Sequence, residues 1–231
     1  MIRSAIAAGI AALFLGSAAF AQAPDTSSDP RQPRSFESRG EVTANGQRVR
    51  YRAIAGETFL RDDDGKAIAS IFSTSYIREG VSDPRTRPVA FIFNGGPGSA
   101  SLWLHMGVFG PVHLVLPSEA EDDGAAPYDL RANPHTLLDS ADLVFIDPVG
   151  TGFSRTLGDA DPAQFWGVNE DARSLGQFIR IWLTENQRWN SPKYLMGESY
   201  GTTRIGALMN ELELGWNNVA FNGVVLISVV M

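Results

Sequence analysis

Short apolar runs without alternation limit the possible folds of this chain more than any other feature. A strand with one face in water alternates apolar and polar residues, whereas a strand covered by helices on both faces is apolar throughout. Runs of the second kind occupy residues 88–93, 142–146, 194–196 and 223–230. Apolar side chains at helical spacing predict a long helix over 162–189, and a second helix is expected over 202–214. Strands that alternate with helices predict an α/β fold with a parallel sheet.

Turn signals closer to the amino end predict antiparallel strands ahead of this sheet. The pair Asn45-Gly46, typical of tight hairpin turns, interrupts a segment over 42–54. A second turn signal, Asp-Asp-Asp-Gly at residues 62–65, precedes a further segment over 66–78. We therefore expect a small region of antiparallel hairpins before the first parallel strand.

The first 21 residues have the three parts of a secretory signal peptide. A short basic start is followed by an apolar run over 5–20 and by the small-residue cleavage pattern at 19–21. A single anchoring helix is the alternative, but the apolar run is shorter than the roughly 20 residues that a membrane span needs. Residues 22–40 are polar and predict a disordered leader. We expect an exported protein, periplasmic or secreted, with no membrane association after cleavage and a folded part over 41–231.

Charge and residue counts exclude several kinds of function. The chain has 19 Lys and Arg against 26 Asp and Glu, a formal net charge of −7 that repels nucleic-acid phosphates. It has no cysteine, which excludes a disulfide framework, a thiolate zinc site and a cysteine nucleophile. Its three histidines all lie between residues 105 and 135, so a histidine-rich metal site is not expected.

A G-x-S-x-G pentapeptide, residues 197–201, stands between a predicted strand and a predicted helix. In that context the pattern indicates a nucleophile elbow, a tight turn that exposes the hydroxyl of Ser199 at a helix N-terminus. Free N–H groups there favour a developing negative charge. Larger side chains in place of Gly197 or Gly201 would collide with neighbouring elements. The alternative, a glycine-rich turn without chemistry, fits the bare pentapeptide better than it fits this context.

Two further glycine loops follow predicted strands. Residues 94–99, Asn-Gly-Gly-Pro-Gly-Ser, can aim bare backbone N–H groups at an oxyanion because no Cβ blocks the approach. The N–H groups of Gly96 and Tyr200 are therefore the candidates for an oxyanion hole. Residues 147–154, Asp-Pro-Val-Gly-Thr-Gly-Phe-Ser, would lie at the same edge of the sheet, either contacting a substrate or only shaping the pocket.

These three motifs, in this order, resemble the serine carboxypeptidases, the S10 peptidase family of α/β-hydrolases. The similarity runs from about residue 87 to residue 231. It implies an α/β-hydrolase fold and removal of residues from the carboxyl end of a peptide substrate, through an acyl-enzyme on Ser199. It also implies an oxyanion hole formed by Gly96 and Tyr200, and no cofactor. The implied substrate-binding residues are Asn94, Gly95 and Glu198, of which Asn94 and Glu198 bind the terminal carboxylate.

The sequence departs from this family at three places. Ser99 stands where the family usually has a cysteine, and Val108 stands where many members have a second glutamate. After Ser199 the chain contains neither aspartate nor histidine, although the triad of an α/β-hydrolase continues in the order serine, acid, histidine. The histidines 105, 113 and 135 precede the serine, and using one as the base would need a rearranged triad.

The chain also stops inside an apolar run, at Met231. We therefore expect an α/β-hydrolase fold truncated after the elbow and the following strand, and little activity from these 231 residues alone. An esterase or acyltransferase on the same scaffold is one alternative to the carboxypeptidase. A catalytically inactive peptide-binding protein is another.

Overall fold

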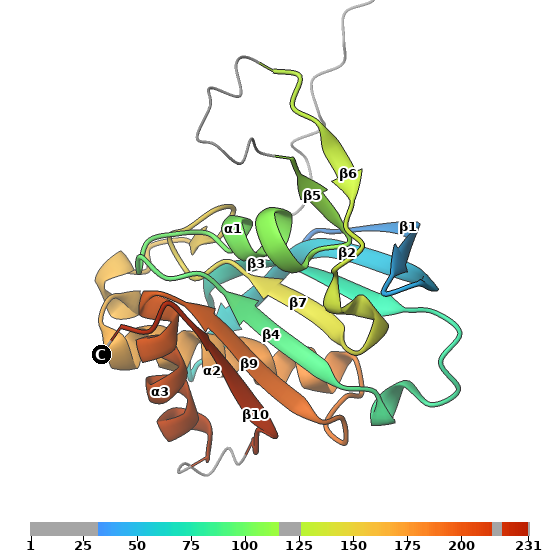
Figure 1. Cartoon of the computed structure of the whole chain (residues 1–231). Helices are drawn as coiled ribbons and strands as arrows, with labels where there is room; N and C mark the ends of the chain where they lie inside the picture. Colours follow the sequence, from blue (N-terminus) through green and yellow to red (C-terminus); the bar gives the residue numbers. More distant parts are fainter. Residues whose placement is uncertain (1–31, 116–125, 214–218, 231) are drawn as a thin grey trace, which may run out of the picture. The chain divides into compact units, whose positions relative to one another are not determined.

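One mixed sheet organises the structure (Figure 1). The computed structural model describes residues 32–115, 126–213 and 219–230, and those from Pro33 onward belong to one structural unit. The strands of the sheet lie in the order β1-β2-β3-β7-β4-β9-β10, with β8 paired to β3. Their bounds are Ser35–Ala44 (β1), Gln47–Arg61 (β2), Ala67–Arg78 (β3), Val89–Phe93 (β4), Asp142–Ile146 (β7), Arg155–Thr156 (β8), Lys193–Glu198 (β9) and Gly223–Ile227 (β10). Pairing is antiparallel from β1 to β7 and parallel from β7 to β10.

Strands β4, β7 and β9 of the parallel half confirm the prediction drawn from the apolar runs. The prediction is wrong for β10, which is not buried on both faces: it is the last strand in the order of the sheet, and Val224, Val225 and Leu226 are exposed. Every residue of β4 and of β7 is buried. Phe93 at the end of β4 pairs with Gly197 of β9, and Ile227 of β10 pairs with Glu198. The carboxyl ends of these strands therefore meet at one edge of the sheet, where open α/β sheets bind their ligands.

Two helices cover one face of the parallel strands (Figure 1). Helix α2 spans Val168–Glu185, and α3 spans Tyr200–Glu213 and packs against it. Their buried side chains join those of the sheet in one core, in which Phe91, Phe178 and Leu208 are fully buried. A second core lies on the opposite face. The elements that contribute to it besides the sheet are α1 (Leu102–Leu104), the π-helical turn His105–Phe109 and the 3-10 turn Leu137–Asp139.

The predicted hairpins are present, and they extend the main sheet. Asn45 and Gly46 both have positive φ, 47° and 77°, at the turn between β1 and β2. The pairing of β3 with β7 joins these antiparallel strands to the parallel half. A separate two-stranded sheet of β5 (Val112–Leu114) and β6 (Leu130–Ala132) is not predicted by the sequence pattern, because each strand has only three residues.

Part of the predicted leader is a strand, so the leader prediction over 22–40 is wrong from residue 35 onward. Residues 35–40 lie in β1, which pairs with β2 along its whole length. Backbone pairing, supported by exposed ion pairs such as Arg52 to Glu37 at 3.2 Å, orders residues that bury little apolar surface. Residues 1–31, with the predicted signal peptide, lie outside the described residues.

The long helix expected over 162–189 is wrong outside residues 168–185. Pro162–Phe165 form a 3-10 turn, in which the Asp161 side chain accepts a hydrogen bond from the N–H of Ala163. Gly167 then has a φ of +115°, which only glycine adopts readily, and separates that turn from α2. The last strand is also shorter than the apolar run over 223–230, because Ser228 has a φ of +50° and ends β10 at Ile227.

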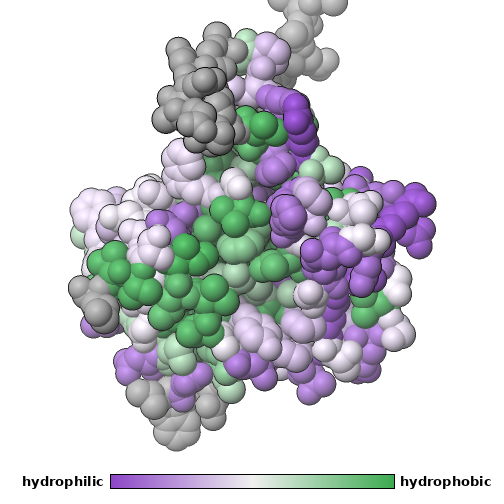
Figure 2. Space-filling model, in the orientation of Figure 1, coloured by the Kyte–Doolittle hydropathy of each residue, from purple (hydrophilic) through white to green (hydrophobic). Residues whose placement is uncertain are grey.

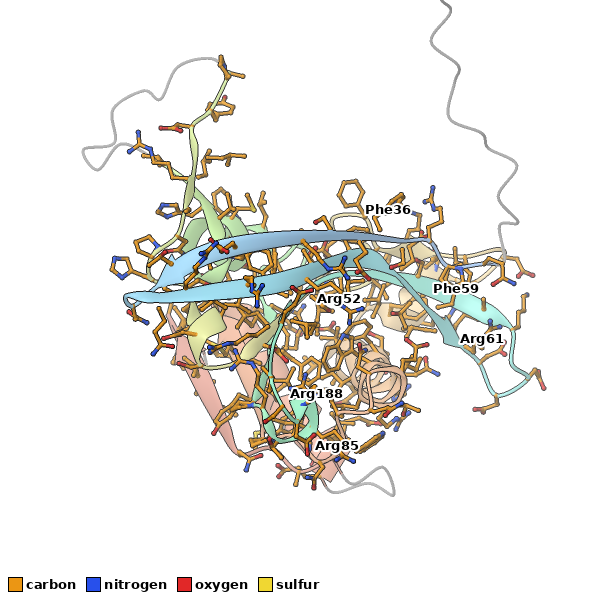
Figure 3. All side chains as sticks on the ribbon, turned by 90° about the vertical axis from the view of Figure 1, so that its right-hand side faces the viewer. Phe36, Arg52, Phe59, Arg61, Arg85 and Arg188 are labelled. Atoms are coloured by element: carbon orange, nitrogen blue, oxygen red, sulfur yellow. The ribbon has the colours of Figure 1, made fainter. Side chains whose placement is uncertain are left out.

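A buried charged cluster lies at the amino ends of the parallel strands, opposite the edge that carries the glycine loops. The carboxylate of Asp142 accepts hydrogen bonds from Nε of Arg87, at 2.8 Å, and from Nη1 of Arg188, at 2.5 Å. Arg188 also donates from Nε to the hydroxyl of Ser191, whose Oγ in turn donates to the carbonyl of Arg85. Arg188 and Arg85 accordingly lie close together in Figure 3. The cluster ties the starts of β4 and β7 to the loop that leads into β9.

Candidate active site

Ser199 occupies a tight turn between β9 and α3, as the sequence pattern predicts. Its φ is +55°, a backbone conformation that residues other than glycine rarely adopt. Its N–H donates to the carbonyl of Ile227 at 2.9 Å, and its own carbonyl accepts from the N–H of Thr202 at 2.9 Å. A Cβ on Gly197 would lie 2.5 Å from the carbonyl oxygen of Gly201. The turn therefore needs Gly197, and a Cβ on Gly201 would lie 3.1 Å from the carbonyl oxygen of Phe93, a tight contact. The turn places the serine at the N-terminus of α3.

The loop after β4 packs directly against this elbow. A Cβ on Gly95 would lie 2.5 Å from the backbone nitrogen of Tyr200 and 2.6 Å from the carbonyl oxygen of Glu198. Gly96 has a φ of +110°, which favours glycine. Both glycines of the loop therefore have a structural requirement: Gly95 for close approach to the elbow and Gly96 for its backbone conformation.

A cavity of about 510 Å³ opens beside Ser199. It brings together four of the six predicted site residues, namely Asn94, Gly96, Glu198 and Ser199. Its other lining residues are Ser99, Trp103, Leu104, Val108 and Ile227. Gly95 lies behind this layer, against the elbow, and the Tyr200 ring lies beside the Arg204 guanidinium and lines a neighbouring pocket.

Asn94 and Glu198 form the polar wall of the cavity. Asn94 Nδ2 donates to Oε2 of Glu198 at 3.1 Å, and Asn94 Oδ1 accepts from the N–H of Leu104 at 3.0 Å. The second bond fixes which way the amide points, because only its oxygen can accept from a backbone N–H. One hydrogen on Nδ2 remains to donate to a ligand, next to the carboxyl group of Glu198.

The surface on the other side of the cavity is apolar. Ile227 lines the cavity at the end of β10, and apolar side chains gather over this strand in the space-filling view (Figure 2). The exposed apolar residues of this segment are Val224, Val225, Leu226, Val229 and Val230. Trp103 and Val108 are also exposed. A ligand at Ser199 therefore meets polar groups on one side and apolar groups on the other.

The third glycine loop, residues 147–154, braces this region without lining the cavity at Ser199. Asp147 Oδ1 accepts from the N–H of Ser101 at 2.9 Å, and its carbonyl accepts from the hydroxyl of Ser154 at 2.6 Å. Burial raises the pKa of Asp147. The sequence leaves open whether this loop contacts a substrate or only shapes the pocket. These contacts favour the second possibility.

His105 does not lie in the cavity at Ser199. It lines a separate cavity of about 330 Å³, stacks on Phe145 at 4.3 Å between ring centroids, and shares a 2.7 Å hydrogen bond with the hydroxyl of Tyr76. His113 lies in β5, and His135 lies in an exposed loop. None of the three is placed to act as a base for the serine.

The buried position of His105 predicts a loss of stability in acid. Burial lowers the pKa of His105 to about 4. Between pH 6.5 and this value His105 is protonated in the unfolded chain but neutral in the folded protein, so acid favours unfolding. Stability is full near neutral pH and falls between about pH 6.5 and 4, by up to about 3 kcal/mol at roughly 1.4 kcal/mol per pKa unit.

Denaturant unfolding at pH 7 and pH 4.5 measures this effect as the difference between the wild type and His105→Gln. Subtracting the unfolding free energy of the variant from that of the wild type at each pH removes the contribution of the carboxylates, which both proteins share. An equal fall in the two proteins contradicts the assignment.

Sequence reasoning missed two buried charged residues beside the site, Asp171 and Arg204. Arg204 is only 1% exposed, and Asp171 lies opposite it on α2. A signal was present, because Arg204 falls on the apolar stripe of α3 that includes Ile205 and Leu208. A charge on such a stripe indicates a buried partner, but spacing alone does not identify the partner.

Across residues 32–115, 126–213 and 219–230, no group of three or more His, Cys, Asp or Glu could hold a metal ion. No helix in that same part of the chain is long and apolar enough to cross a membrane.

Comparison with known proteins identifies the family. The family model for serine carboxypeptidases matches residues 73–230. Serine carboxypeptidase-like 34 of Arabidopsis thaliana is 30% identical over 178 residues, which cover 74% of this chain and 32% of the relative. Serine carboxypeptidase-like 8 of the same plant is 29% identical over 142 residues, covering 61% and 31%. This chain thus spans about a third of the length of the curated relatives it matches.

The fold also resembles a solved carboxypeptidase. The crystal structure of Kex1(delta)p, a prohormone-processing carboxypeptidase from Saccharomyces cerevisiae, superposes with a TM-score of 0.59 at 21% identity. The match covers 76% of this chain and 38% of that one. The strand order, the elbow after β9 and the helices on one face of the sheet agree with an α/β-hydrolase fold. The chain belongs to the serine carboxypeptidase family.

Proposed function

We propose that this protein is a serine-type carboxypeptidase that removes residues from the carboxyl end of peptides through an acyl-enzyme on Ser199. The observation that carries the proposal is the shared cavity: the serine hydroxyl and the hydrogen-bonded pair of Asn94 and Glu198 line the same 510 Å³ space. A nucleophile close to a carboxylate-binding pair suits a substrate cleaved near its terminus.

Each predicted site residue has a role in this proposal. Ser199 attacks the carbonyl carbon, and the N–H groups of Gly96 and Tyr200 stabilise the resulting oxyanion, helped by the N-terminus of α3. Asn94 donates from Nδ2 to the terminal carboxylate, and Gly95 holds the loop backbone beside it. Glu198, which accepts the hydrogen bond from Asn94, lies beside the same carboxylate.

Full turnover also needs a base for Ser199. No histidine follows Ser199 in the sequence, and His105, the one nearest in sequence to the glycine loop, stacks on Phe145 in another cavity. We propose that the histidine and its acid partner come from outside these 231 residues. The 231 residues by themselves then retain at most the residual catalysis that binding and an oxyanion hole supply.

The amino-terminal segment completes the proposal. Residues 1–21 act as a cleaved signal peptide, and the protein is exported to the periplasm or secreted. The segment from residue 22 up to the start of β1 at Ser35 is a leader, and the hydrolase domain begins at that strand. The substrate is a peptide, and neither nucleic acid nor a membrane takes part.

Peptide cleavage by the protein as its gene encodes it tests the proposal. Three substrates share one blocked dipeptide: the free acid, its carboxyl-terminal amide and its ethyl ester. Mass spectrometry of the products, with Ser199→Ala as the control, measures the release of each leaving group. We expect cleavage of the free acid to exceed that of the amide at least tenfold, and Ser199→Ala to release nothing from any of them.

The other outcomes identify the alternatives. Cleavage of the ester alone indicates an esterase or acyltransferase, which the apolar wall of the cavity would also suit. Peptide binding that persists in Ser199→Ala, with no turnover by either form, indicates an inactive binding protein. Equal cleavage of the acid and the amide contradicts the carboxylate-binding role of Asn94 and Glu198.

A further inference from the structure

We propose that Arg204 is a positioning residue that holds the oxyanion loop, defined here as residues 94–97, in its working conformation, with Asp171 as its counter-ion. This inference rests on the proposed function of Ser199. It adds a buried ion pair on the helix side of the loop to the residues that the reaction requires.

The contacts of Arg204 reach both ends of the loop. Nη1 donates to the carbonyl of Asn94 at 2.6 Å, and Nη2 donates to the carbonyl of Pro97 at 3.2 Å. The two carbonyls stand on either side of Gly95 and Gly96. One rigid guanidinium therefore fixes the peptide planes that flank the glycine pair.

The same guanidinium contacts the other half of the oxyanion hole. Its central carbon lies 5.3 Å from the centroid of the Tyr200 ring and 5.5 Å from that of Phe93. Tyr200 supplies the second proposed oxyanion donor, through its N–H, and Phe93 is the last residue before the loop. Cation–π contact with both rings holds the plane of the guanidinium and places the loop relative to the elbow.

Glycines make such a brace necessary. Gly95 and Gly96 have no side chains to restrict their backbone, so the loop alone has many conformations of similar energy. An oxyanion hole works only when its donors lie about 2.7–3.1 Å from the developing charge, before the reaction begins. The N–H of Gly96 shares a peptide unit with the carbonyl of Gly95, which accepts from the N–H of Ser99 at 3.1 Å. By holding the carbonyls of Asn94 and Pro97 on either side, Arg204 limits how far this peptide unit can turn.

Asp171 makes the buried arginine tolerable. Arg204 Nε donates to Asp171 Oδ2 at 2.6 Å, and an arginine that is 1% exposed needs such a partner for its charge. Burial raises the pKa of Asp171, and the neighbouring charge of Arg204 opposes that rise. Because Asp171 lies on α2, the pair links both helices to the loop.

Lysine cannot replace this arginine. Three different acceptors, on α2, at Asn94 and at Pro97, are met by three nitrogens of one flat group. A lysine has a single ammonium centre and cannot reach all three in this geometry.

Steady-state kinetics of Arg204→Met and Arg204→Lys, on the peptide that the wild type cleaves, tests the role. We expect kcat to fall about 100-fold in Arg204→Met, the order seen when one oxyanion donor is lost, with KM within about twofold. We expect Arg204→Lys to recover less than a tenth of the kcat that Arg204→Met loses. Arg188→Met is the matched control, since Arg188 is also a buried, paired arginine but lies at the far edge of the sheet.

The control separates positioning from stability. Arg188→Met lowers the melting temperature, yet at a temperature where each protein is folded it keeps the wild-type kcat. Equal falls of kcat in Arg204→Met and Arg188→Met, or a rise of KM with kcat unchanged, overturn the proposal.

Nuclear magnetic resonance on the same proteins gives a readout that does not depend on turnover. We expect the backbone order parameters of Gly95 and Gly96 to fall from about 0.85 toward 0.6 or lower in Arg204→Met but not in Arg188→Met. If the wild type cleaves no substrate, the proposed function fails, and these order parameters still decide whether Arg204 holds the loop. Unchanged order parameters in Arg204→Met contradict the positioning role.

Discussion

Replacing Asp142 by asparagine lowers the free energy of unfolding by about 3–5 kcal/mol, as expected when one partner of a buried ion pair is removed. Asp142 is fully buried, and its carboxylate is shared between Arg87 and Arg188, with side-chain exposures of 9% and 3%. It also accepts from the N–H of Arg78 at 2.9 Å. Asparagine has nearly the same shape, but it leaves two guanidinium groups without a counter-ion and places an amide donor against donors.

Urea unfolding of Asp142→Asn and the wild type at pH 7 measures the loss. Asp129→Asn is the matched control, because Asp129 also pairs with an arginine, Arg131, but both side chains are more than half exposed. Exposed pairs contribute about 0–1 kcal/mol, so this control changes little. A loss below about 1 kcal/mol in Asp142→Asn would show that the cluster is not a major support of the fold.

The parts of the fold that could be predicted are those that depend on local pattern. The apolar runs at 88–93 and 142–146 became strands because each is buried on both faces, and this requirement is visible in five or six consecutive residues. The elbow was visible for the same reason, since a turn so tight that it needs Gly197 can be recognised from the sequence. The positions of four predicted site residues in one cavity follow from strand ends that share an edge.

The parts that could not be predicted depend on partners distant in sequence. Residues 35–40 are a strand only because β2 lies alongside, and their own composition is that of a loop. Arg204 is visible as a charge on an apolar stripe, but its partner Asp171 is 33 residues away on another helix. In both cases the deciding contact is absent from the local pattern. Gly167 is different, because it ends the predicted helix through its own backbone angle, which a glycine permits but does not require.

Replacing Gly95 by alanine reduces kcat/KM by about 100-fold or more. The alanine Cβ would lie 2.5 Å from the nitrogen of Tyr200, 2.6 Å from the carbonyl oxygen of Glu198 and 2.9 Å from the nitrogen of Gly201. All three are backbone atoms, so no side chain can turn aside. The loop must move away from the elbow, which separates the proposed oxyanion donors of Gly96 and Tyr200, and losing one such donor costs about 100-fold to 1000-fold in kcat.

Gly98→Ala is the matched control for this substitution. Gly98 lies three residues further along the chain, and a Cβ built on it meets nothing within 4 Å. Peptide hydrolysis by the protein as its gene encodes it, compared among wild type, Gly95→Ala and Gly98→Ala, measures the effect, and circular dichroism shows which variants remain folded. Because both changes add one methyl group to a glycine loop, their difference isolates the contact with the elbow. Equal activities in the two variants contradict the view that close packing of this loop against the serine turn forms the oxyanion hole.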